Sequence, residues 1–107
     1  MKMIISIVSN DDSSAVMSGL TKAGYQATKL ATTGGFLMTG NTTFIIGTDD
    51  DRVDGAIEVI RRHCKKRSQV LPSTMPYGVG TYNSMPVEVS VGGATVFVID
   101  VERFEKL

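Results

Sequence analysis

Apolar residues along the first half of the chain occur either in continuous runs or at helical spacing. Residues 3–8 are almost continuously apolar and β-branched, which predicts a central strand covered on both faces. The polar run at 10–14 offers N-cap side chains for a helix, in which Val16, Leu20 and Ala23 recur at helical spacing and which Gly24 can end. Segments 26–31 and 42–47 predict two strands that flank a glycine-rich loop.

The clearest helical pattern follows three consecutive aspartates at 49–51, which we expect to cap it. Basic residues between 61 and 66 would end this helix, as the helix dipole favours. Residues 68–85 show no periodicity, so we expect a long loop, which in a compact domain is usually functional or disordered. The apolar residues at i, i+3, i+4 spacing predict the buried stripe of the helix: Val53, Ala56, Ile57, Ile60 and Cys64.

The end of the chain predicts two further strands. Valines at 87, 89 and 91 alternate with polar residues, and Gly92-Gly93 predicts a tight hairpin turn into a strand at 94–101. The resulting order is β-α-β, β-α-β with a hairpin before the last strand. This order is typical of the ferredoxin-like α+β fold, an antiparallel sheet with two helices on one face. Strands this apolar also predict that self-association covers the other face.

The composition limits the classes of protein to which this chain could belong. The 107 residues suit one domain, 1–107, and 42% of them are hydrophobic, as in folded proteins. Eleven basic and eleven acidic residues leave no net charge, which argues against nucleic-acid binding. A single cysteine permits no intrachain disulfide, and no segment approaches the roughly 20 apolar residues of a membrane span. We therefore expect a cytoplasmic protein without a membrane partner.

Most candidate chemistry has a simpler structural interpretation. Cys64 falls on the apolar stripe, so we expect a core residue, and neighbours on a helix such as His63 and Cys64 do not face each other as a catalytic pair would. The sequence contains no cluster of histidines and cysteines that would predict a metal site. The basic run 61–67 is either a patch for an anionic partner or a solvated helix end, and the helix dipole favours the second.

Residues 27–47 form a nearly neutral segment with six threonines, four glycines and one formal charge, at Lys29. Hydroxyls, backbone N–H groups left accessible by Gly34 and Gly35, and the ring of Phe36 suit a phosphorylated ligand with a flat base. A β-hairpin with threonines chosen for strand propensity accounts for Thr42 and Thr43. Composition alone leaves both interpretations open.

Longer stretches of the chain resemble a known family. ATKLATTGGFL at 27–37 and GNTTF at 40–44 are similar to the signature of the PII-like cyclic di-AMP receptors of the PstA type, as are residues 50–54, 85–89 and 91–98. The resemblance extends from the first strand to the last. It implies a homotrimer that binds cyclic di-AMP in clefts between subunits, with a short T-loop at about 32–40 and an enlarged B-loop at about 68–85. It also implies a non-enzymatic receptor without a cofactor, in which the ligand reorders loops and thereby regulates an unknown downstream protein.

The resemblance also implies roles for individual residues. The Thr28 hydroxyl would bind phosphate, and Asn41 with the backbone near Gly47 would read the adenine edge, to which an amide offers a donor and an acceptor. Phe36 would in addition pack on a base. The backbone amides expected to cradle the phosphodiester are those of Gly35, Phe36 and Leu37.

One departure from the family keeps alternatives open. Family members often carry Arg where this chain has Gln26, and losing a charge-assisted bond weakens binding by roughly 1.5–3 kcal/mol. One alternative is a PII-like paralogue that binds a different nucleotide. Another is a small nucleotide-hydrolysing enzyme. Its nearby candidate groups are hydroxyls and Lys29, whose side chain we expect on the strand face opposite Thr28.

Overall fold

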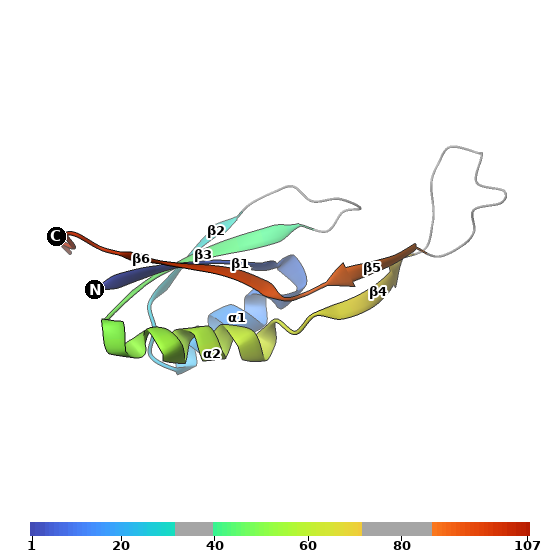
Figure 1. Cartoon of the computed structure of the whole chain (residues 1–107), viewed down its shortest axis with the longest axis horizontal. Helices are drawn as coiled ribbons and strands as arrows, with labels where there is room; N and C mark the ends of the chain where they lie inside the picture. Colours follow the sequence, from blue (N-terminus) through green and yellow to red (C-terminus); the bar gives the residue numbers. More distant parts are fainter. Residues whose placement is uncertain (32–39, 72–86) are drawn as a thin grey trace.

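The computed structural model describes residues 1–31, 40–71 and 87–107 of the chain (Figure 1). One antiparallel sheet has the strand order β2-β3-β1-β6, and α1 and α2 both lie on one side of it. A separate two-stranded ribbon pairs β4 with β5. The elements are β1 (Lys2–Ser9), α1 (Asn10–Lys22), β2 (Ala27–Ala31), β3 (Asn41–Thr48), the 3-10 turn η2 (Asp50–Arg52), α2 (Val53–His63), β4 (Arg67–Leu71), β5 (Val87–Val91) and β6 (Ala94–Asp100).

The predicted α+β arrangement of four antiparallel strands with two helices on one face is confirmed. With β6 as the last strand, the sheet order is that of a ferredoxin-like βαββαβ unit. β1 is central, as predicted, because it pairs with β3 on one side and β6 on the other. The ribbon of β4 and β5 is inserted between α2 and β6.

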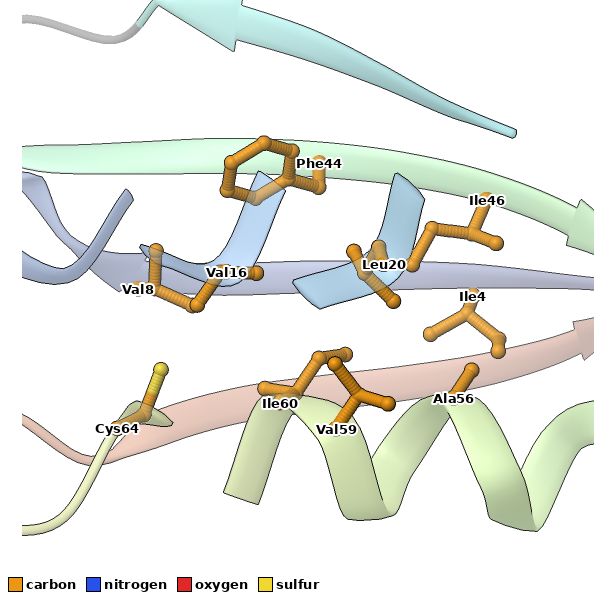
Figure 2. Close-up of a cluster of buried hydrophobic side chains, with 10 residues drawn as sticks. All are labelled: Ile4, Val8, Val16, Leu20, Phe44, Ile46, Ala56, Val59, Ile60 and Cys64. Carbon is orange, nitrogen blue, oxygen red and sulfur yellow. The ribbon is translucent and has the colours of Figure 1, made fainter. Parts of the chain in front are cut away.

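The core lies between the helices and one face of the sheet (Figure 2). On this face Ile4, Phe44 and Ile46 are fully buried, and each of these side chains contributes about 1.5–3 kcal/mol relative to exposure. The predicted stripe of α2 is confirmed at Ala56 and Ile60, whereas Val53 and Ile57 are half-buried and Val59 is buried instead. Cys64 is buried as predicted, but it follows the end of α2 at His63. The core residues are Ile4, Val8, Val16, Leu20, Phe44, Ile46, Ala56, Val59, Ile60 and Cys64.

The predicted hairpin turn at Gly92-Gly93 is wrong. β5 pairs with β4, from Arg67↔Val91 to Leu71↔Val87, and β6 pairs with β1. The two glycines, with φ of 86° and 74°, instead carry the chain from the ribbon into the main sheet. The loop expected to begin at Ser68 is also wrong at its start, because residues 67–71 are strand β4. The remainder of that expected loop, 72–85, and residues 32–39 of the expected T-loop lie outside the described residues.

Capping differs from the prediction at both helices. Ser9, one residue before the expected polar run, caps α1, and its side chain accepts a bond from the Asp11 amide. No aspartate side chain caps η2 or α2; Asp50 pairs with the amino terminus at 3.1 Å instead. Gly24, with φ of 87°, follows the end of α1 as predicted.

Candidate functional site

The sheet face opposite the helices is apolar, and no helix in the described part of the chain covers it (Figure 1). Phe44 and Ile46 point into the core, so the alternate positions of β3 lie on this open face. β1, expected to be covered on both faces, is covered on one within the single chain. Phe97 remains 53% exposed and Ile99 44%. The strand register places these apolar residues on the open face: Met3, Ile5, Ile7, Leu30, Ile45, Phe97 and Ile99.

Thr28 lies on this open face. It is an exposed residue of the edge strand β2 and pairs with Ile45 of β3. Its neighbour Lys29 pairs with Phe44, whose side chain points toward the helices. The two side chains therefore leave β2 on opposite faces, as predicted, and the one formal charge of the 27–47 segment lies on the face away from Thr28.

Gly47 lies near Thr28, two residues beyond Ile45 on β3 and opposite Met3 of β1. A Cβ built on Gly47 meets no described atom within 4 Å, and its φ is not in the left-handed region. Neither packing within the described chain nor backbone conformation requires a glycine here. Glycines inside strands often mark a bulge, a tight bend, or a place where a ligand or another backbone approaches closely. Gln26, exposed and just before β2, is adjacent to Gly47 when the register is continued by one residue.

Asn41 lies at the opposite end of β3. It is exposed and pairs with Ser9, four residues from Ile45, which places it about 14 Å along the strand from the level of Thr28. The structure thus brings Gln26, Thr28 and Gly47 together and separates Asn41 from them within one chain. The remaining site residues predicted from the sequence, Gly35, Phe36 and Leu37, lie outside the described residues.

A polar network holds the start of β3 against the first turn of α1. The Asn10 amide donates to the Gly40 carbonyl at 3.0 Å, and the Thr42 hydroxyl donates to Asn10 Oδ1. The Ser13 hydroxyl donates to the Asn10 carbonyl at 2.9 Å. The sequence predicts a helix cap at Asn10 and a strand at Thr42, but not the contact between them. This contact fixes the backbone next to Asn41.

Electrostatic features lie mainly away from this face. Burial raises the pKa of the Cys64 thiol to about 11, and the nearby Asp12 carboxylate raises it further. Cys64 is thus a neutral thiol in the core at ordinary pH, as expected. A hydrogen bond between Lys2 and Asp100 raises the pKa of the lysine and lowers that of the aspartate.

Two further observations concern metals and membranes. Within residues 1–31, 40–71 and 87–107, no three His, Cys, Asp or Glu residues are grouped to hold a metal ion. None of the helices in the same described ranges is long and apolar enough to cross a membrane.

Known proteins are similar to this chain along its full length. A sequence model of a family described as "Cyclic-di-AMP receptor" matches residues 1–107. The crystal structure of a functionally unknown protein from Pediococcus pentosaceus ATCC 25745 is similar at 39% identity with a TM-score of 0.75. The similarity covers 99% of this chain and 96% of that protein.

Proposed function

Because the chain belongs to the cyclic-di-AMP receptor family, we propose that it is a non-enzymatic receptor that binds cyclic di-AMP on the open sheet face, in the clefts of a homotrimer. The observation that carries this proposal is the open space at Gly47 next to the exposed Thr28. A glycine that nothing within the described chain requires suits close approach by a ligand, and the adjacent hydroxyl supplies a hydrogen-bond donor for a phosphate oxygen.

The apolar character of the open face supports the trimer. Ile5 and Ile45 are side by side at its centre, and Phe97 lies beside Ile5 on β6. A contiguous exposed apolar surface of this kind favours association, and further copies of the chain are the simplest cover. Assembly would also place groups of a neighbouring subunit close to Thr28 and Gly47, and so complete a cleft.

The finer assignments follow from the family resemblance. In this proposal Asn41 reads an adenine edge, Gln26 bonds the ligand without a charge, and the amides of 35–37 hold the phosphodiester. Asn41 is about 14 Å along β3 from the level of Thr28, so the two would contact different parts of the ligand or two ligands in adjacent clefts. Binding would then reorder loops and alter a surface for a downstream protein.

Calorimetry with two neighbouring substitutions tests the site. We expect Thr28→Val to weaken cyclic di-AMP binding by about tenfold, because it removes a hydroxyl bonded to a charged phosphate. Lys29→Gln is the matched control: it removes a charge one residue away but on the other face, and the affinity should be unchanged. The assignment of Thr28 is wrong if Lys29→Gln weakens binding and Thr28→Val does not.

Other nucleotides in the same assay test the paralogue alternative that Gln26 raises. Heat with cyclic di-GMP, ATP or AMP, and none with cyclic di-AMP, would reject the ligand proposed here. Prolonged incubation with cyclic di-AMP, followed by chromatography of the nucleotide, tests the non-enzymatic part. Recovery of intact ligand is expected, and its turnover would reject a pure receptor.

A further inference from the structure

The ribbon of β4 and β5 is attached to the rest of the molecule in an unusual way. It belongs to a sheet of its own, with no strand pairing to β2, β3, β1 or β6 (Figure 1). In Figure 1 it extends beyond the end of the main sheet, with β4 in yellow and β5 in orange. An isolated two-stranded ribbon is marginally stable in water, so the contacts at its base determine how it is held.

At this base Arg67, the first residue of β4, is held by Asp12 of α1. The guanidinium forms a fork on the carboxylate, with Nη2–Oδ1 at 3.1 Å and Nη1–Oδ2 at 3.5 Å. Nη1 also donates to the Lys65 carbonyl at 3.1 Å. The Asp12 side chain is only 10% exposed, whereas that of Arg67 is 44% exposed. A two-point contact with a nearly buried carboxylate fixes direction as well as distance.

The other strand of the ribbon leaves from the same point. Gly92 directly follows β5, and a Cβ there would contact the Lys65 carbonyl and come within 2.9 Å of Arg67 Nη1. Its φ of 86° also favours glycine. The start of β4 and the end of β5, which together form the base of the ribbon, are therefore both packed around the Asp12–Arg67 pair.

The turn of helix that carries Asp12 also carries Asn10, which binds Gly40 and Thr42 at the start of β3. Asn10 and Asp12 are two residues apart in the first turn of α1, so a shift of the backbone at one displaces the other. Asn41, a residue of the proposed ligand site, lies between Gly40 and Thr42. One rigid turn thus contacts both the proposed site and the base of the ribbon.

We propose that the first turn of α1 is a brace that couples the start of β3 to the β4–β5 ribbon, with Asp12 and Arg67 as positioning residues, so that ligand at Asn41 changes how the ribbon is held. The ligand-dependent part rests on the proposed function. The brace itself does not, because it is built from contacts within the chain. Coupling of this kind is reciprocal: a change at either end alters the equilibrium at the other.

Hydrogen exchange of the ribbon amides tests the brace without any ligand. Thr42→Val removes the hydroxyl that binds Asn10 and touches no residue of the ribbon in the described contacts. We expect it to speed exchange at 67–71 and 87–91 by about fivefold, the lower end of typical coupling. In an Arg67→Gln background, which already lacks the fork, Thr42→Val should have no further effect on the ribbon. Amides of β1 serve as the internal measure of global unfolding. Additive effects, or equal acceleration in β1, would overturn the brace.

A second measurement tests its use by the ligand. Cyclic di-AMP should slow exchange of the ribbon by about tenfold in the wild type and by less than about twofold in Asp12→Asn, with calorimetry on the same samples verifying that ligand binds. Asp11→Asn is the matched control, because it removes a charge from the same turn at an exposed residue for which the described structure gives no ion pair.

The outcomes separate the two proposals. If the wild type binds no cyclic di-AMP, the proposed function fails while the ligand-free measurement still decides the brace. If ligand binds and protects the ribbon equally in Asp12→Asn, the coupling through α1 is wrong and the proposed function stands.

Discussion

Gly47→Ala separates the needs of the fold from those of the proposed site. The added methyl meets no described atom within 4 Å and sits in a strand whose φ suits any residue. The substitution therefore costs no packing, and it reduces the entropy of the unfolded chain, which stabilises by about 0.4–1 kcal/mol. We expect the urea midpoint, followed by circular dichroism, to rise slightly or stay unchanged.

The same methyl should obstruct the ligand. If cyclic di-AMP contacts the backbone at Gly47, the methyl displaces it and removes at least one hydrogen bond, which is worth about 1.5–3 kcal/mol when a charged group takes part. The expected loss of affinity is about ten- to a hundredfold, measured by calorimetry. Unchanged affinity in a stable protein would refute our reasoning at Gly47. Loss of the trimer in light scattering would show that a neighbouring subunit, rather than the ligand, makes the close approach at Gly47.

Four further measurements address the open face and the core. Phe97→Asp places a charge on the open face at a side chain that is 53% exposed, so in light scattering the trimer should dissociate while the chain stays folded. Phe104→Asp makes the same change outside the sheet and should leave the trimer assembled. If Phe97→Asp is still a trimer, the open face is not the interface. Gly19→Ala puts a Cβ 2.8 Å from His63 Nε2 and 3.0 Å from the stiff Val59 side chain. The cost of overpacking should outweigh the gain in helix propensity, so the free energy of unfolding should fall by about 1 kcal/mol. A more stable variant would contradict this. The Cys64 pKa of about 11, against 9.0 for an ordinary thiol, gives a contribution to stability that is complete below pH 9 and falls by about 3 kcal/mol as the pH rises through 11. In urea unfolding, the stability difference between wild type and Cys64→Ala should therefore shrink over this range. A difference that does not change with pH would show that the thiol ionises freely in the fold. Cyclic di-AMP affinity should change by less than about threefold between about 50 and 500 mM salt, because no cation lies among the open-face residues named above. A steep salt dependence would mean that a cationic side chain contacts the ligand.

The helices and strands that could be predicted from the sequence are those in which the spacing of apolar residues reflects which face is buried. Ala56 and Ile60 recur at helical spacing because one face of α2 packs on the sheet, and the apolar run of β1 marks a central strand. The partner of β5 could not be predicted in the same way. Alternation at 87–91 shows that a strand exists, but pairing with β4 or with β6 suits the same pattern equally well.

The candidate site was less accessible to sequence reasoning than the fold. Thr28 and Gly47 were named through the family resemblance, since neither has a periodicity of its own. Gly47 is notable for the open space next to its backbone, and that space is a property of the folded chain that the sequence does not show. The contacts of Asn10 with Thr42 and of Asp12 with Arg67 join residues 32 and 55 positions apart. Side-chain contacts at such separations depend on how the helix is placed against the sheet, which local patterns do not encode.

The placement of charge explains how a protein with no net charge would hold an anionic ligand. Lys29 leaves β2 on the helix side, while Thr28 and Gly47 lie on the open face with the apolar side chains of β1. A cation on that face would have to be desolvated when subunits associate, and a buried unpaired charge is costly. Hydroxyls and backbone amides cost far less to desolvate than a charge does, and they still bond phosphate oxygens once the ligand is enclosed. In the proposed trimer, where the binding face is also the assembly face, a neutral site therefore suits a phosphodiester ligand better than a cationic one.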